Sequence, residues 1–190
     1  MSGFFLTFVL VDLYCKKISY NWNDILGFKK DLADIIKDCF IGIIGLAILF
    51  FSLKILFIIY PEILNKFLSR ETSSKFLLGF IELKNAGFHG LIIASFLMFL
   101  GVVSEEIVFR GFMLKYLWNK YNSLLAIIFT TLLFSVIHIY PYKIFPLIIM
   151  GVILGISRVY TRCLLPPIII HYLYNISLLL FENVVAKIIM

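Results

Sequence analysis

The sequence predicts an all-α protein, a polytopic membrane bundle of about five or six transmembrane helices. Apolar residues make up 62% of the 190 residues and charged residues only 15%. Soluble domains are about 45–50% apolar and about 25% charged, so this composition excludes an ordinary soluble enzyme and a disordered chain. Three scattered cysteines without metal-ligand spacing also exclude a disulfide framework. Several apolar runs have the length that a hydrocarbon core of about 30 Å requires.

The first two segments differ in length. Residues 3–14 are apolar apart from Thr7 and Asp12, but about 12 residues are too few to cross a bilayer, so we interpret them as a short or partial first span. Residues 39–60 form the clearest run, with 22 residues and Lys54 as the only charge. At about 1.5 Å per residue such a helix reaches about 33 Å.

Four further apolar runs follow, at residues 87–103, 123–140, 144–156 and 163–181. The first of these does not end at Val103, because the apolar pattern resumes at Ile107 and continues to Leu114. We therefore predict one long helix that extends to about Tyr116, with Glu105 near its middle. The alternative is that residues 107–121 form a re-entrant or interfacial piece.

The net charge of +6 comes from basic residues that lie between the apolar runs. In these positions orientation signals and lipid headgroups account for the charge better than nucleic acid does, so we expect no nucleic-acid partner. If the first segment spans, alternate loops carry nine basic residues on one side, Arg158 among them, and six on the other. This bias places the loop of residues 16–38 in the cytoplasm.

Polar side chains inside the apolar runs are the candidates for function. A charged residue near the bilayer centre costs at least about 2.5–3.5 kcal/mol, so it remains there only when it is paired or faces a wet cavity. Lys54 can reach the interface through its long side chain, and His89 opens its run, so we expect both to lie near headgroups. The other polar residues in the runs are Glu105, Glu106, Arg110, His138, His171 and Asn175.

The acidic pair has two distinct environments. On a helix, neighbours differ by about 100° and residues four apart by only about 40°. Glu106 and Arg110 therefore share a face and can form an ion pair, whereas Glu105 points away from it. An unpaired carboxylate in a low dielectric suits a general base near neutral pH. The alternative is a helix end with its charges at the headgroups.

Two more helices carry polar residues at a spacing of four. Phe134 and His138 share one face, and so do His171 and Asn175. Taken singly, each pattern also fits a hydrogen-bonded core histidine or a helix–helix hydrogen bond. Taken together with the acidic pair, they lie on three membrane segments, where such groups must satisfy one another in a shared pocket. A carboxylate, two imidazoles and an amide donor are the parts of a hydrolase.

These motifs carry a family resemblance. Glu105-Glu106-x-x-x-Arg110, Phe134-x-x-x-His138 and His171-x-x-x-Asn175, in this order on successive membrane helices, resemble the three motifs of the CPBP intramembrane proteases. That family includes the CAAX prenyl endopeptidases and the bacterial bacteriocin-processing and self-immunity proteins, also called Abi proteins. The resemblance covers about residues 87–181.

The resemblance implies an intramembrane endopeptidase with assigned residue roles. It implies that Glu105 activates water, that His138 and His171 hold that water, that Asn175 stabilises the oxyanion, and that Glu106 with Arg110 organises the site. It leaves the cofactor open between a divalent metal such as zinc, with Glu105, His138 and His171 as candidate ligands, and no metal. The His-Glu-x-x-His spacing of many zinc proteases is absent from the sequence.

The prediction for the whole chain follows from the resemblance. Residues 1–86 supply N-terminal membrane segments and loops, and residues 87–190 supply a catalytic membrane core within the same integrated domain. We expect a multi-pass protein of the cell membrane that contacts lipid and hydrolyses a hydrophobic or lipidated peptide. The alternatives are a catalytically silent self-immunity or scaffold protein of the same fold, and a proton or ion carrier that uses the buried Glu and His residues.

Overall fold

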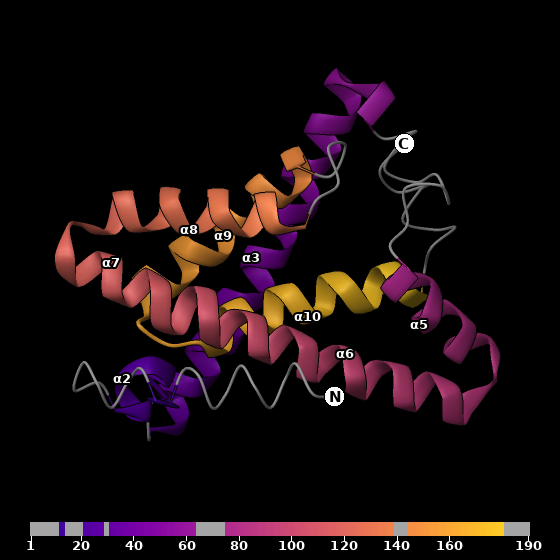
Figure 1. Ribbon diagram of the computed structural model, residues 1–190, viewed down its shortest axis with the longest axis horizontal. Coiled ribbons are helices and arrows are strands. Elements are labelled where there is room, and N and C mark those ends of the chain that lie inside the picture. The colour runs from indigo at the N-terminus through magenta and orange to yellow at the C-terminus, as the bar shows by residue number, and fades with distance from the viewer. Residues whose placement is uncertain (1–11, 14–20, 29–30, 64–74, 139–143, 181–190) are drawn as a thin grey trace.

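The computed structural model describes residues 12–13, 21–28, 31–63, 75–138 and 144–180 (Figure 1). Regular structure in these ranges is helical, with no strand among them. The helices described below are α2 (Trp22–Leu26), α3 (Leu32–Ile59), α5 (Lys75–Asn85), α6 (Phe88–Glu106), the π-helix η2 (Ile107–Met113), α7 (Leu114–Lys120), α8 (Ser123–Ile137), α9 (Ile144–Thr161) and α10 (Leu165–Leu180). The predicted all-α fold is confirmed.

The helices α6, η2 and α7 form one continuous stretch of 33 residues. In Figure 1 this stretch crosses the whole molecule, with α8 folded back beside α7. The prediction of a single long helix that runs past Glu105 is therefore confirmed. The π-helical segment in its middle is a feature that the apolar pattern does not predict. There the N–H of Leu114 donates to the carbonyl of Phe109, five residues back, instead of the usual four.

Helix α3 packs one face against α10 and α9. Its buried side chains recur every four residues, at Leu49, Leu53 and Phe57, which is the spacing of one helix face. A Cβ at Gly45 would come within 2.5 Å of the Ile170 side chain. A glycine at this position therefore lets α10 lie directly on α3.

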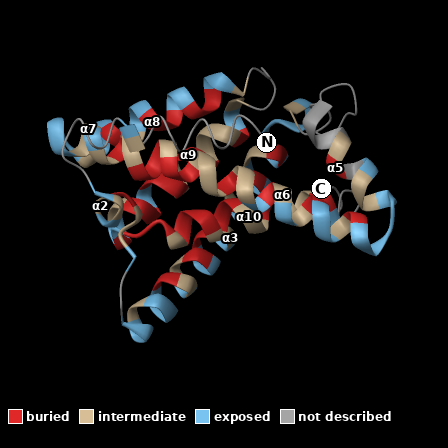
Figure 2. Ribbon diagram, turned by 60° about the horizontal axis from the view of Figure 1, so that its bottom comes forward, coloured by how far each residue is buried: buried red, intermediate tan, exposed pale blue. Residues whose placement is uncertain are grey.

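Helix α9 packs most closely against α8. A Cβ at Gly151 would approach Thr131 to 2.8 Å, and one at Gly155 would approach Ile127 to 3.1 Å. Small residues four apart thus bring two membrane helices into close contact. The buried residues of α3, α8, α9 and α10 meet in the interior of the bundle (Figure 2).

The boundaries of α9 correct the sequence-based charge count. The apolar run ends at Ile156, but the helix continues to Thr161. Arg158 therefore lies in the last turn of α9 and is only 3% exposed. Its assignment to a loop was wrong, because one more helical turn carries the side chain into the protein, so it is no orientation signal.

The outer faces of the helices are apolar, as lipid contact requires. Large side chains such as Phe51, Phe96 and Phe129 are more than half exposed. Three stretches have the length and composition of membrane spans, and two shorter apolar helices accompany them: Leu32–Ile59, Phe88–Lys120 and Ile144–Thr161, then Ser123–Ile137 and Leu165–Leu180. The chain is thus a membrane helix bundle. The expected first span, residues 3–14, lies almost wholly outside the described residues.

Candidate active site

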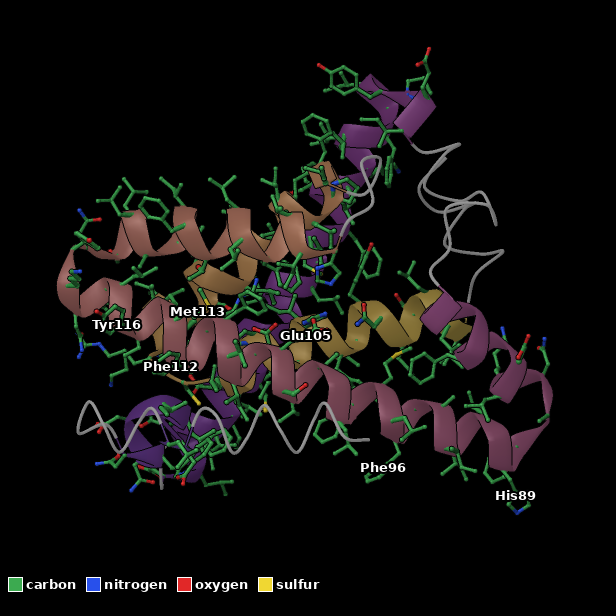
Figure 3. The ribbon with its side chains drawn as sticks, in the orientation of Figure 1. His89, Phe96, Glu105, Phe112, Met113 and Tyr116 are labelled. Carbon is green, nitrogen blue, oxygen red and sulfur yellow. The ribbon has the colours of Figure 1, made fainter. Side chains whose placement is uncertain are left out.

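The acidic pair lies near the middle of the long helix, at the junction of α6 and η2. Glu106 is fully buried, whereas the side chain of Glu105 is 40% exposed. The predicted divergence of the two neighbours is confirmed. Figure 3 shows Glu105 in the central part of the helix and His89 at its distant end, pointing out of the bundle. His89 is therefore no part of this site.

One carboxylate oxygen organises the buried part of the site. Glu106 Oε1 accepts a hydrogen bond from Arg110 Nη1 at 3.0 Å and makes a second one with His171 Nδ1 at 2.7 Å. All three side chains are at most 3% exposed. The predicted Glu106–Arg110 pair is confirmed, and it extends to α10 through His171. Since the carboxylate is paired with arginine, we assign the donated proton of the second bond to Nδ1.

Glu105 and His171 face each other across a short gap. The distance from Glu105 Oε2 to His171 Nε2 is 3.9 Å. With the proton on Nδ1, Nε2 carries a lone pair and accepts hydrogen bonds. A water that donates to two acceptors at about 2.8 Å each allows them to be at most about 5.6 Å apart. The distance of 3.9 Å lies within this limit, so one water can bridge the two atoms.

An aromatic ring joins His138 to the same site. The ring of Phe134 lies 4.6 Å from the His138 ring and 5.9 Å from the His171 ring, and Arg110 lies over it at 4.4 Å. His138 ends α8, and its Nδ1 bonds the carbonyl of Phe134 at 2.7 Å. A carbonyl only accepts, so this Nδ1 carries the proton and Nε2 has the lone pair.

Asn175 is less firmly placed in the site. It lies one turn after His171 on α10 and is half-buried. Among the described residues, no hydrogen bond or ring contact ties it to the other candidates. The structure thus joins Glu105, Glu106, Arg110 and His171 directly and joins His138 through the Phe134 ring. The role of Asn175 stays a prediction.

The two histidine tautomers give a first testable prediction. The chain has only three histidines, so ¹⁵N-histidine NMR in detergent micelles can resolve each of them, with His→Gln variants for assignment. We expect His138 and His171 as Nδ1–H tautomers, because Nδ1 of each has an oxygen partner at 2.7 Å. Exposed His89 serves as the reference. Spectra that show Nε2–H on His171 at neutral pH would contradict the assigned hydrogen bond to Glu106.

The candidate metal ligands do not form a metal centre. Within the described part of the chain, no group of three or more His, Cys, Asp or Glu side chains is arranged to hold a metal ion. The proposed ligand set of Glu105, His138 and His171 therefore does not fit a metal in this arrangement.

The comparison with known families agrees with these motifs. Residues 87–177 match the family model described as type II CAAX prenyl endopeptidase Rce1-like. The matched segment is therefore similar to the Rce1-like family. The match confirms the resemblance that the three motifs predict, and it supports a CAAX-type protease. No curated protein and no solved structure shows a significant match to the chain.

The Rce1-like segment contains all six candidate residues but not α2 or α3.

Sequence reasoning missed two features of the site. One is the shared ring of Phe134, which the spacing pairs only with His138. The other is buried Arg158, which binds the carbonyl of Arg110. The buried positions Leu154, Arg158 and Thr161 share a helix face, and this spacing is the signal that identifies Arg158 as inward-facing.

Proposed function

We propose that the chain is a multi-pass intramembrane endopeptidase of the cell membrane, in which Glu105 activates a water that His171 helps to hold. The observation that carries the proposal is the 3.9 Å gap between Glu105 Oε2 and His171 Nε2. Both atoms accept hydrogen bonds, so a water between them donates both its protons and turns an oxygen lone pair outward. This is the arrangement that a nucleophilic water needs.

The reaction follows from this arrangement. The water oxygen attacks the carbonyl carbon of the scissile peptide bond while Glu105 takes one proton. The tetrahedral intermediate then collapses, the C–N bond breaks, and Glu105 returns the proton to the leaving amine. Glu106 holds His171 in one orientation and one tautomer throughout, because its carboxylate fixes Nδ1–H. His138 offers a second imidazole Nε2, and its ring lies 4.6 Å from the Phe134 ring that also contacts His171.

The developing oxyanion needs a hydrogen-bond donor. The Asn175 carboxamide is the proposed donor, since it is half-buried on α10 one turn from His171. Preorganised donors of this kind contribute about 10²–10³-fold to kcat. Arg110 supports the site from its buried side, where its Nε and Nη2 have no hydrogen-bond partner among the described residues.

The proposed substrate is a membrane-bound peptide, either hydrophobic or lipidated. Two features support it: the family description names prenyl endopeptidases, and the faces around the site are apolar and exposed. The partly exposed Glu105 side chain makes the site reachable from outside the bundle. Membrane lipid is the other expected partner.

A peptide assay tests the proposal. Purified protein in micelles is incubated with a farnesylated CAAX peptide and with its unlipidated form, and the products are identified by mass spectrometry. We expect endoproteolytic cleavage of the farnesylated peptide and a decrease in kcat of about 10²–10³-fold for Asn175→Ala. Ser177→Ala on the same helix is the control, since its hydroxyl donates only to the nearby Tyr174 carbonyl. Equal rates for Asn175→Ala and wild type would remove Asn175 from the mechanism, and no cleavage by wild type would contradict the proposal.

A further inference from the structure

Arg158 is a buried cation that bonds backbone carbonyls from two distant segments. Its Nη2 donates to the carbonyl of Ile25 at 2.8 Å, and its Nε donates to the carbonyl of Arg110 at 3.2 Å. A weaker contact of Nη2 reaches the carbonyl of Asp24 at 3.4 Å. The side chain of Arg158 thus links helix α2 to the π-helical segment η2. A guanidinium suits this task because its donors form a rigid planar fork.

The carboxyl end of α2 is held at three successive carbonyls. Lys115 Nζ donates to Asp24 O at 2.9 Å, Arg158 to Ile25 O, and the N–H of Leu164 to Leu26 O at 2.9 Å. The last carbonyls of a helix have no partner within the helix and carry its negative dipole end. Two cations and one backbone N–H supply the partners here, so α2 is fixed to the bundle although it has only five residues.

The turn after α2 fits closely against the turn between α9 and α10. Gly27 adopts the left-handed conformation, with φ of 63°. A Cβ at this position would lie 1.9 Å from the carbonyl oxygen of Arg162. Only glycine combines this backbone conformation with so close an approach. The position of α2 is therefore set by backbone contact as well as by the cations.

Helix α2 also packs directly against η2. Ile25 is fully buried, and a Cβ at Gly111 would come within 2.7 Å of its side chain. Gly111 directly follows Arg110 in the π-helical segment. The backbone that carries Arg110 is therefore held by Ile25 on one side and by the Arg158 guanidinium at its carbonyl.

The hydrogen-bond pattern explains why this carbonyl is available. Leu114 N–H bonds Phe109 O, five residues back, and α-helical spacing resumes in α7. When the bonds return from five-residue to four-residue spacing, one carbonyl is left without a backbone N–H partner. That carbonyl is the one after Phe109, which belongs to Arg110. A buried carbonyl without a partner is destabilising, and Arg158 Nε supplies the partner.

We propose that Arg158 is a positioning residue of the active site, which acts through the backbone of Arg110 on the orientation of His171. The link is short: Arg158 fixes the Arg110 backbone, the Arg110 side chain pairs with Glu106, and Glu106 holds His171 Nδ1. Helix α2, which lies outside the Rce1-like segment, is then part of the working site. The effect on turnover rests on the proposed function, but the effect on His171 does not.

Two measurements on Arg158→Met test this role. The first is the ¹⁵N-histidine spectrum, in which we expect the His171 signal to change from one Nδ1–H tautomer to a mixture, while His138 and His89 stay unchanged. The second is peptide cleavage, in which we expect kcat to fall by about 10–100-fold at unchanged KM, because small displacements of reacting groups have effects of this size. Both are measured on monodisperse, helical protein.

A matched control and a conservative variant complete the design. Ser157→Ala removes a buried hydroxyl next to Arg158 on α9, which donates to the Leu154 carbonyl of the same helix. We expect it to leave both readouts unchanged. Arg158→Lys keeps the charge, but one ammonium cannot replace a fork that binds Ile25 O and Arg110 O together, so we expect the same mixture of His171 tautomers. If Arg158→Met does not fold, the Lys variant carries the test.

The outcomes separate the two proposals. An unchanged His171 signal and unchanged kcat in folded Arg158→Met, or full recovery of both by lysine, would overturn the positioning role. A wild-type chain that cleaves no peptide but shows the expected His171 change would contradict the protease and leave the positioning role in place. Peptide cleavage by wild type, together with a His171 signal that does not change in Arg158→Met, would support the protease and overturn the positioning role.

Discussion

Replacing Glu105 with glutamine is expected to abolish peptide hydrolysis while leaving the fold intact. The carboxamide keeps the size of the side chain but cannot accept the proton of the attacking water. General bases contribute about 10²–10⁴-fold to catalysis, so the decrease in kcat should lie in this range. The side chain is 40% exposed, and its Oε2 lies 3.9 Å from Nε2 of the neutral His171 ring. Stability should therefore change by no more than about 0.5 kcal/mol, as for other exposed positions.

The matched control is Glu82→Gln. Glu82 is exposed on α5, so the substitution removes a carboxylate without touching the site, and kcat should stay at the wild-type value. The measurement is the initial rate of cleavage of the farnesylated peptide, with the unfolding transition recorded for each variant. A Glu105→Gln protein that retains more than a tenth of the wild-type kcat would show that another group activates the water.

The same variant separates the alternative functions of this fold. A self-immunity or scaffold protein does not need proton transfer, so Glu105→Gln would preserve its biological effect. If the chain is a proton carrier, Glu105→Gln would reduce proton flux into liposomes. In that case even the wild-type protein would cleave no peptide. Loss of cleavage without any pH-dependent flux is the pattern that a protease predicts.

Helix positions were predictable because lipid imposes a simple rule. A membrane helix has to be apolar over most of its length. The long apolar runs therefore predicted α3, the helix through Glu105, α9 and α10. The i, i+4 rule likewise placed Glu106 and Arg110 together and turned Glu105 away. Both predictions depend on local geometry, which the spacing of residues determines directly.

Other features depend on contacts between distant segments and leave no local pattern. The bond from Glu106 to His171 joins positions 65 residues apart, and the one from Arg158 to Arg110 joins positions 48 apart. The sequence placed Arg158 in a loop, because its charge ends the apolar run while the helix goes on. The π-helical segment also leaves no local pattern in the sequence. It leaves the carbonyl of Arg110 in need of a hydrogen-bond donor, and that donor, Arg158, lies on another helix.

The buried pair of Glu106 and Arg110 is expected to show strong coupling in stability. Both side chains are at most 1% exposed, so removing one charge leaves the other unpaired in a low dielectric. Glu106→Gln and Arg110→Met should each lower the free energy of unfolding by about 3–5 kcal/mol. The double variant has no unpaired charge, so its stability should return to within about 1–2 kcal/mol of wild type. Unfolding in mixed micelles can be followed by the fluorescence of the two tryptophans, Trp22 on α2 and Trp118 on α7.

Activity should not return with stability in the double variant. The carboxamide that replaces the Glu106 carboxylate offers His171 only a neutral oxygen, and carboxylates that orient a working histidine contribute about 10–100-fold in metal enzymes. We therefore expect the double variant to fold like wild type and to cleave peptide at least about tenfold more slowly. Additive losses of stability in the two single variants and the double would contradict a direct Glu106–Arg110 pair. Full activity in the stable double variant would instead assign Glu106 to the fold alone, because His171 would then work without a negative charge at Nδ1.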